Sequence, residues 1–362
     1  MISAAESGTR SRPVVELVAL LVIGCGVIAL ARWGHAGASA DGGILRLQGS
    51  AFGTTWHVTV AGAPAGEREQ LQAALAAELE RLDAVFSVWR DDSELARLNA
   101  HPANEPLTIS QELMAVLVLA ARIHRGSAGA FDPSVGPLVR LWGFGPDAPA
   151  PAPAPPSQDA VAAVRARVGF DLLRLDPGTC TVVKERADLE LGLGAIAKGH
   201  AVDALSELLV RRGKASHIVE IGGEVRARGH RAPGRPWRVG IQTPRAGSAV
   251  EARIALPLRD GAVATSGDYR NFRELAGQRV SHIIDPTTGA PVHHRTASVS
   301  VLASSCAAAD GWATALNVLG AQRGLTVAER EGLAALFIVR RSDGGFDEQA
   351  TTGFATVLEE TR

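Results

Sequence analysis

The amino-acid sequence predicts an α+β fold with mixed sheets and flanking helices, contained in one domain over residues 47–362. Three observations predict this class. Helical spacing of apolar residues is commonest in the first part of the chain, whereas short strand patterns dominate from His217 onward. Regular alternation of strands and helices is rare, which disfavours a doubly wound parallel sheet. No internal repeat is visible in the 362 residues.

Composition excludes several functional classes. The net charge of −1 leaves no basic face large enough to meet a nucleic-acid backbone. The three cysteines, Cys25, Cys180 and Cys306, lie far apart and form no CxxC pair, which argues against a zinc site or a disulfide framework.

The amino-terminal segment is typical of an export signal. Arg10 and Arg12 precede an apolar run over residues 14–31, and a Gly/Ala/Ser-rich stretch follows. Three outcomes are compatible with it: a retained membrane anchor, cleavage after residues 38–40, or lipidation at Cys25 in a lipobox-like sequence. Because apolar residues continue past Cys25, we favour an anchor over residues 1–33 with a tether over 34–46. The domain would then face the periplasm from the inner membrane of the bacterial envelope.

The first half of the domain alternates strand, helix and polar turn. Residues 54–60 alternate as a strand, and residues 67–86 repeat leucines at helical spacing. Ser93 and Ser110 are expected as helix N-caps, with the second helix ending at Gly126. Trp89, beside a charged turn, is either a lid over a flat ligand or a hydrophobic plug, and the residues alone favour the plug.

A Pro/Ala-rich run over residues 146–156 interrupts the middle of the chain. Such a run is extended and often links domains. Because we expect the motifs on both sides to serve one pocket, we interpret it as a surface loop. The elements expected after it are a helix over 157–168 and strands over 172–175, 180–184, 217–221, 237–242, 252–258, 262–265, 280–284 and 296–302, followed by a helix over 307–319 and a strand pair over 336–340 and 354–358.

The stretch from Leu189 to Leu209 is the first candidate for chemistry. Gly192 and Gly194 allow close backbone approach, the helix that follows begins with available amides, and Lys198 adds a positive charge. These features favour an anion cradle, although the spacing fits neither GxGxxG nor a P-loop. The alternative is a packing turn with a solvated lysine.

A second candidate lies on the helix over residues 307–319. Asp310 and Thr314 are four residues apart, which places a carboxylate and a hydroxyl on one helix face. Two such oxygen donors suit Mg²⁺, which completes its coordination with water and substrate phosphates. The alternative is a helix-start charge and a hydroxyl at the edge of the core.

Two polar turns complete the set. His282, next to a Pro/Gly turn, is a candidate proton acceptor, whereas Asp285 is expected to make the Asx turn that Asp-Pro-Thr-Thr-Gly favours. Ser266 and Gly267 could add hydroxyl and amide donors. The absence of GxSxG and HExxH argues against a serine hydrolase or a zinc protease.

Taken in order, these motifs resemble the ApbE family, the FAD:protein FMN transferases, over residues 47–358. The matching segments are GTTWHV, SVWRDDSELARLN, AFDPSVGPLVRLWGFG, GAIAKGHAVD, IGGEVRARG, ATSGDYRNF, SHIIDPTTG and the helix that carries Asp310. The resemblance implies Mg²⁺-dependent transfer of FMN from FAD to a threonine hydroxyl of a partner protein, with release of AMP.

The resemblance also implies roles for individual residues. Asp310 and Thr314 would bind the metal together with the backbone carbonyl of Ala195, and Lys198 would contact the flavin nucleotide. Asp310 and His282 would be the catalytic pair. Residues implied to line the FAD site are Phe52, Trp89, Ala130, Phe131, Asp132 and Ile284. Gly192 also falls in that site, at a position where family members often carry Asp.

The expected partner is an exported or membrane-embedded redox subunit with an acceptor threonine. Two other activities remain open at this stage. One is hydrolysis of FAD to FMN and AMP at the same site, and the other is a non-catalytic flavin-binding assembly factor for a respiratory complex.

Overall fold

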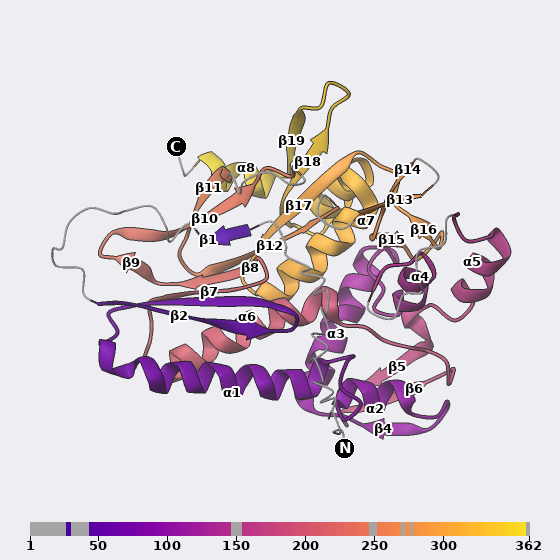
Figure 1. The fold of residues 1–362 in the computed structure, drawn as a ribbon, viewed down its shortest axis with the longest axis horizontal. Helices are drawn as coiled ribbons and strands as arrows, with labels where there is room; N and C mark the ends of the chain where they lie inside the picture. Colours follow the sequence, from indigo (N-terminus) through magenta and orange to yellow (C-terminus); the bar gives the residue numbers. More distant parts are fainter. Residues whose placement is uncertain are drawn as a thin grey trace, which may run out of the picture.

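A computed structural model describes residues 27–29, 43–145, 154–245, 252–268, 272–275 and 278–359. A long sheet separates a layer of helices from a second, smaller sheet (Figure 1). Helices and sheets are therefore combined as the α+β class requires. Mixed sheets were expected, but every strand pair in the described ranges is antiparallel, so that part of the prediction is wrong.

The long sheet has eight strands, and neighbours in space are often distant in sequence. In spatial order they are β19 (Phe346–Ala350), β18 (Ala334–Arg340), β17 (Thr296–Ala303), β12 (Gly261–Gly267), β8 (Glu224–Arg228), β7 (His217–Ile221), β3 (Thr54–Ala61) and β2 (Ile44–Ala51).

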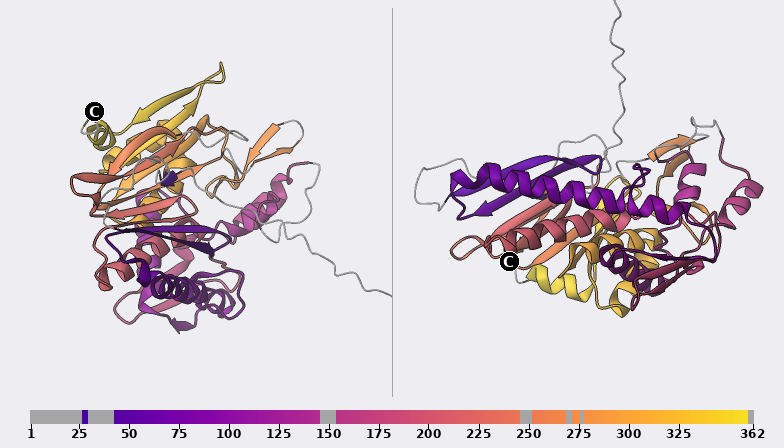
Figure 2. Two further views of the ribbon diagram at one scale, coloured as in Figure 1. Left: turned by 60° about the vertical axis from the view of Figure 1, so that its left-hand side comes forward. Right: turned by 90° about the horizontal axis from the view of Figure 1, so that it is seen from below.

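Three helices cover one face of this sheet: α1 (Arg68–Phe86), α6 (Gly194–Arg211) and α7 (Cys306–Arg330). α1 and α6 run side by side (Figure 2). Their apolar faces and those of the central strands form the main core. α1 also closes the sheet edge, because Arg68 and Gln72 donate hydrogen bonds to backbone carbonyls of β2.

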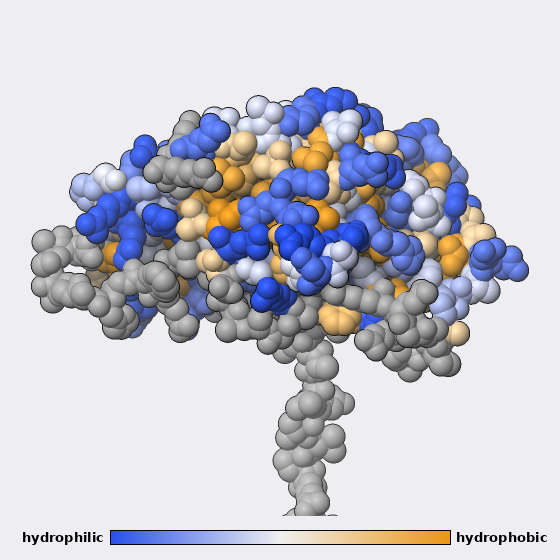
Figure 3. Space-filling view, turned by 90° about the horizontal axis from the view of Figure 1, so that it is seen from above, coloured by the Kyte–Doolittle hydropathy of each residue, from blue (hydrophilic) through white to orange (hydrophobic). Residues whose placement is uncertain are grey.

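The opposite face packs against β10 (Arg235–Gln242) and β11 (Ala252–Leu258), joined at the edges by β1 (Val27–Ala29) and β9 (His230–Ala232). Trp237 and Val239 of β10 share an apolar cluster with Val225 and Val263 of the long sheet. The helix α8 (Thr352–Glu359) seals the neighbouring cluster through Phe354. Seen from above, apolar side chains form separate areas between polar ones (Figure 3).

A peripheral unit packs beside the helix layer (Figure 1). Its elements are α2 (Glu94–Ala100), α3 (Gln111–Gly126), α4 (Gly136–Leu141), α5 (Gln158–Arg165), the 3₁₀ turn η2 (Phe170–Leu172), the sheet of β4 (Pro106–Thr108), β6 (Thr181–Lys184) and β5 (Leu173–Asp176), and the two-stranded pairs β13 (Phe272–Leu275) with β14 (Gln278–Ser281) and β15 (Ile284–Asp285) with β16 (Ala290–Pro291). A further 3₁₀ turn, η1 (Ala65–Glu67), lies outside this unit and leads directly into α1.

Local helix signals in the sequence are confirmed. The hydroxyls of Ser93, Ser110 and Ser157 accept hydrogen bonds from the amides three residues later. The carboxylate of Asp285 accepts hydrogen bonds from the amide and hydroxyl of Thr287, at 2.8 and 2.6 Å, which confirms its Asx turn.

Three element predictions are wrong. Residues 354–358 belong to helix α8, and the partner of β18 is β19, an exposed edge strand without an apolar alternation to reveal it. The strand expected over 280–284 is divided, because β14 ends at Ser281 and β15 begins at Ile284. The helix expected over 307–319 continues to Arg330 beyond a break at Gly320, where φ is 70°.

The predicted anchor, the lipidation site at Cys25 and most of the tether and of the 146–156 loop lie outside the described residues. Within the predicted anchor only Val27–Ala29 is described, as a strand paired with β10. None of the helices in the described ranges has the length and apolar character needed to cross a bilayer.

Candidate functional site

Several of the sequence motifs lie together at one end of the long sheet. The β2–β3 turn, the β7–β8 turn and the last residues of β12 all lie at this end, because the strands between them are antiparallel and in close register. Gly222 in the β7–β8 turn donates its amide to the Thr55 carbonyl at 3.1 Å. The start of α6 reaches the same place, since Lys198 contacts Glu224 at the beginning of β8.

The glycine turn before α6 is held by the peripheral unit. The Gly192 amide donates to the Pro133 carbonyl at 2.8 Å, and Asn99 exchanges two hydrogen bonds with the backbone of Leu191. Lys184, fully buried, donates to the carbonyls of Asn99, Ala187 and Leu189. The backbone entering the turn is therefore fixed from three sides.

The first turn of α6 carries no side-chain cap. Its N-cap residue is Leu193, which has no side-chain acceptor, although its carbonyl accepts the Ile196 and Ala197 amides. Gly194 is exposed, and among the described residues no atom outside its own helix and chain neighbours lies within 4 Å of the position that a Cβ would take. An uncapped helix start with exposed glycine can receive an anion through its amides. This observation supports the anion-cradle interpretation of the sequence.

Lys198 does not project into solvent. Its ammonium lies 2.8 Å from Oε1 of Glu224 and 3.8 Å from Oδ2 of Asp310, and only 11% of its side chain is exposed. Glu224 is fully buried and Asp310 nearly so. The solvated-lysine alternative is therefore wrong. Two carboxylates and one ammonium leave this cluster with a formal charge of −1, which favours a cation beside it.

Asp310 lies directly against the start of α6. Its Oδ2 accepts a hydrogen bond from the Gly199 amide at 3.1 Å. In an α-helix the Gly199 amide also points toward the carbonyl four residues earlier, which is that of Ala195. Oδ2 of Asp310 and the Ala195 carbonyl oxygen therefore both lie next to the Gly199 N–H group. Burial raises the pKa of the Asp310 carboxyl, while Lys198 and the Gly199 amide oppose that shift. Asp310 thus lies near the start of α7, as both interpretations of the sequence expect, and it is buried against α6.

The donors at this junction fit Mg²⁺. Asp310 offers a carboxylate, Ala195 a carbonyl, and Thr314, half-buried one turn after Asp310, a hydroxyl. No cluster of three or more His, Cys, Asp or Glu side chains suited to a metal is found in the described ranges. A hard cation bound here would therefore depend on one carboxylate, neutral oxygens and the substrate.

A ladder of charge pairs sets the position of α6 on the sheet. Along β8, Glu224, Arg226 and Arg228 contact Lys198, Asp203 and Glu207 respectively. Alternate strand residues are about 6.6 Å apart, close to the rise of four or five helical residues. Each of the three strand residues therefore lies opposite its partner on the helix, and the Glu224–Lys198 pair is the one at the candidate site.

The sequence profile of the ApbE family matches residues 52–337, most of the chain. The chain belongs to the ApbE family. A curated relative from Vibrio cholerae, named FAD:protein FMN transferase, is 40% identical over 315 residues, which cover 87% of this chain and 92% of the relative.

Solved ApbE structures share the fold. The flavin transferase ApbE from Vibrio cholerae superposes with a TM-score of 0.78 at 38% identity, covering 87% of this chain and 99% of that one. The apo form of the flavinyl transferase ApbE from Pseudomonas stutzeri gives a TM-score of 0.78 at 36% identity, covering 87% and 97%.

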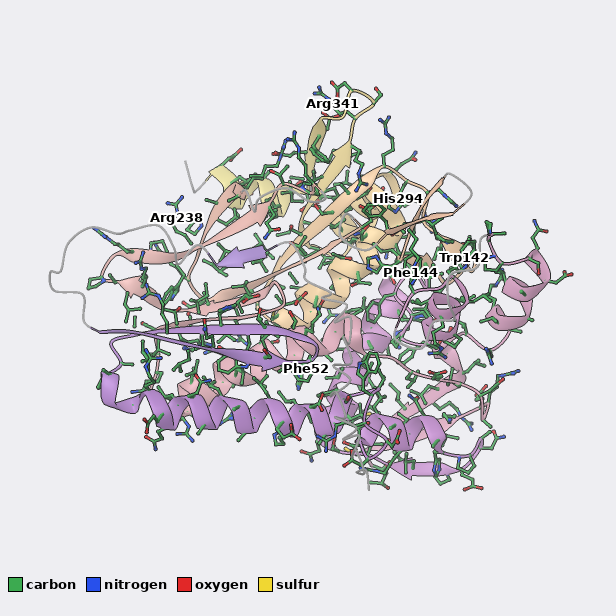
Figure 4. All side chains as sticks on the ribbon, viewed as in Figure 1. Phe52, Trp142, Phe144, Arg238, His294 and Arg341 are labelled. Atoms are coloured by element: carbon green, nitrogen blue, oxygen red, sulfur yellow. The ribbon has the colours of Figure 1, made fainter. Side chains whose placement is uncertain are left out.

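Two of the residues that the ApbE resemblance implies in FAD binding lie close to the α6–α7 junction. Phe52 and Gly53 form the two-residue β2–β3 turn, both with positive φ (Figure 4). A phenylalanine in that conformation costs about 1–2 kcal/mol, and such strain is often retained for function. The Phe131 ring packs beside Gly311, the residue after Asp310.

The other members of the Ala130–Asp132 segment have internal partners. Ala130 is buried, and the Asp132 carboxylate accepts hydrogen bonds from the amide and hydroxyl of Ser134 and from the Phe170 amide. The structure thus uses Asp132 to shape the loop that presents Phe131. A role in lining the FAD site stays a prediction for both residues.

Trp89 is 68% exposed, so the hydrophobic-plug prediction is wrong. An indole in this position is available to stack on a flat ligand. His282 lies against Phe144, with ring centroids 6.3 Å apart. Ile284, buried in β15, follows two residues later, and β15 packs on α7.

Sequence reasoning missed Glu224, Asp203, Lys184 and Asn99. A signal for the first existed in IGGEVRARG, where an acidic residue follows two glycines and alternates with arginines. Its spacing of two matches a strand, but its partners on α6 could not be identified without the fold. The carbonyl contacts of Lys184 left no pattern in the sequence.

Proposed function

We propose that this protein transfers FMN from FAD to a threonine hydroxyl of a target redox protein in an Mg²⁺-dependent reaction, releasing AMP. The observation that carries the proposal is the convergence of Asp310 and Lys198 on the uncapped start of α6. Family membership supports the same reaction, since the curated relatives carry the name FAD:protein FMN transferase.

The chemistry requires charge neutralisation at a diphosphate. The bond from the FMN phosphorus to the bridging oxygen of FAD breaks, AMP leaves with that oxygen, and a new phosphoester bond forms between the FMN phosphorus and the threonine oxygen. Mg²⁺, held by Asp310, Thr314 and the Ala195 carbonyl, would supply Lewis acidity toward the phosphate oxygens. The α6 amides would stabilise negative charge as it develops on those oxygens.

The remaining residues are proposed to bind and orient the two substrates. Lys198 holds the two carboxylates in their ion pairs and adds positive charge near the diphosphate. His282 is proposed to take the proton from the incoming hydroxyl, because an imidazole is a suitable base near neutral pH. Phe52, Phe131 and Trp89 are proposed to contact the flavin nucleotide. Gly192 is proposed to lie in the FAD site as well, at a place where an added Cβ would be 4.0 Å from the Pro133 carbonyl oxygen.

We further propose that the domain acts on the periplasmic side of the inner membrane, next to exported redox subunits. The basic and apolar amino-terminal sequence supports this placement.

The test is incubation of the purified full-length protein with FAD, Mg²⁺ and an exported fragment of a candidate redox subunit. A mass gain of one FMN on a fragment threonine is the expected result. Release of free FMN and AMP without a labelled fragment would indicate hydrolysis, and unchanged bound FAD would indicate a carrier.

A further inference from the structure

The first turn of α7 is capped by a residue of another helix. Asp203 of α6 accepts hydrogen bonds from the Ser305 hydroxyl at 2.8 Å, the Cys306 amide at 2.9 Å and the Ala307 amide at 3.0 Å. The Ser305 hydroxyl accepts a hydrogen bond from the Ala308 amide, and the Ser305 carbonyl accepts one from the Ala309 amide. All four amides at the start of α7 are therefore satisfied.

Asp203 is also charge-balanced. Arg226 of β8 donates to its Oδ1 at 2.6 Å, and both side chains are mostly buried. A carboxylate at a helix start is further stabilised by the helix dipole. These contacts hold the carboxylate in one orientation between a strand and two helices.

A second contact lies four residues away along each helix. Gly199 of α6 donates its amide to Asp310 of α7, just as Asp203 accepts from Cys306. The two helix backbones touch at Gly199, where an added Cβ would lie 2.4 Å from the Cys306 carbonyl oxygen. Four residues advance an α-helix by about 6 Å, so the two contacts form a matched pair along the crossing.

We propose that Asp203 is a positioning residue for the metal site: it fixes the register of α7 on α6 and thereby holds Asp310 opposite the Ala195 carbonyl. This inference rests on the proposed function, because it assigns Asp203 to the metal site proposed there. Asp203 itself touches neither metal nor substrate. Without it, the cap of α7 is lost, and the register depends on the Gly199–Asp310 hydrogen bond and on packing between the two helices.

The test measures metal affinity rather than turnover. Mn²⁺ is titrated into the full-length protein in the presence of ADP, a diphosphate that carries no FMN, and free Mn²⁺ is followed by electron paramagnetic resonance. Asp203→Ala is expected to weaken Mn²⁺ binding by about tenfold, as loss of a supporting residue commonly does. Asp203→Asn, which keeps one acceptor oxygen, is expected to retain part of the affinity.

Glu207→Ala is the matched control. Glu207 lies one turn further along α6 in the same ladder, and its ion pairs in the described part of the chain are with Arg226 and Arg228 of β8 rather than with α7. Its loss is expected to leave Mn²⁺ affinity within about twofold of wild type. ADP affinity in EDTA and the melting temperature are measured for every variant.

Wild-type Mn²⁺ affinity in a folded Asp203 variant would overturn the inference, as would an equal loss in Glu207→Ala. If Asp203→Ala does not fold, Asp203→Asn decides by the same criteria. Absence of Mn²⁺ binding by the wild-type protein would instead remove the metal site of the proposed function, and this inference with it.

Discussion

The starts of α6 and α7 meet at the same junction but are built in opposite ways. At α7 every amide of the first turn is satisfied by Asp203 or Ser305, and the thiol of Cys306 is fully buried. At α6 the N-cap is Leu193, which provides no side-chain cap, Gly194 is exposed, and Lys198 follows four residues later. One helix start is closed by protein and the other is open.

This difference indicates that one helix start has a structural role and the other a role in binding the substrate. A closed helix start cannot receive a phosphate, because its donors are already used. An open one retains amides and the positive end of the dipole for an anion. We therefore assign α7 to holding Asp310 in place and α6 to receiving the diphosphate. The predictions below test this division, beginning with the largest expected effect.

Asp310→Ala tests the closed helix. We expect transfer activity to fall by at least about 1,000-fold, because the only carboxylate at the proposed metal site is lost. The fold should persist, since Asp203 and Ser305 still cap α7. The measurement is FMN transfer by mass spectrometry together with a thermal melt. Wild-type transfer by this variant without added metal would refute the metal assignment.

Lys198→Met tests the role of the lysine near the uncapped start of α6. Glu224 is fully buried and would lose its ion pair with Lys198, which we expect to cost about 3–5 kcal/mol of unfolding free energy. The double variant with Glu224→Gln should recover much of that loss, because Glu224 would no longer carry a buried charge. Urea unfolding measures both. Unchanged stability of the single variant, with unchanged FAD affinity, would show that the lysine has neither role.

The far end of α6 provides a pH test. His217 on β7 contacts Ser206 of α6 at 2.7 Å, and burial lowers the pKa of its imidazole from 6.5 to about 4. The neutral form is thus favoured in the folded state, so its stabilising contribution is present above pH 6.5 and is lost as pH falls toward 4. We expect a loss of about 3 kcal/mol across this window.

The measurement for His217 is urea unfolding at several pH values. His217→Gln should show a shallower decline in unfolding free energy between pH 6.5 and 4 than wild type, whatever its stability at pH 7. Identical slopes would contradict the assignment of the shift to His217.

Two glycines on α6 compare the open and closed surfaces directly. Gly199→Ala forces a Cβ against the Cys306 backbone, which we expect to cost about 1–3 kcal/mol and to weaken metal binding. Gly194→Ala, with open space around it, should change stability by less than about 1 kcal/mol. Thermal melts and Mn²⁺ titration measure both variants. Equal effects of the two substitutions would mean that α6 and α7 can move apart at Gly199 without loss of stability or metal affinity.

Trp89→Ala should have the smallest effect on stability, within about 0.5 kcal/mol, because the side chain is mostly exposed. If the indole stacks on the flavin, FAD affinity should fall by about three- to tenfold, equivalent to a stacking contribution of about 1 kcal/mol. Fluorescence titration with FAD measures it. Unaltered affinity would leave Trp89 outside the site.

Local features of the fold were readable from the sequence. Serine caps, leucine spacing in α1 and the Asx turn at Asp285 depend on neighbours in the chain, and they agree with the structure. Residues 352–359 show the limit: their β-branched and aromatic residues favour a strand, but packing of Phe354 against β18 makes them a helix. Strand β19, with an exposed surface, carries no apolar pattern to predict.

The site was predictable in its residue types but not in its contacts. Lys198 and Asp310 were identified as candidates, yet 111 residues separate Asp310 from its partner Gly199. The roles of Asp203 and Glu224 depend on how α6 crosses β8 and α7, which only the assembled fold determines. Contacts of this kind leave no local periodicity in a single sequence.

The central claim is that a metal and a diphosphate meet where Asp310 faces the open start of α6. The most direct measurement is anomalous diffraction from a crystal of the full-length protein soaked with Mn²⁺ and ADP. We predict an anomalous peak within about 2.0–2.3 Å of Asp310 and of the Ala195 carbonyl, with phosphate density at the Gly194 amide. A peak elsewhere, with Asp310 still bound to the Gly199 amide and no phosphate at α6, would contradict the claim.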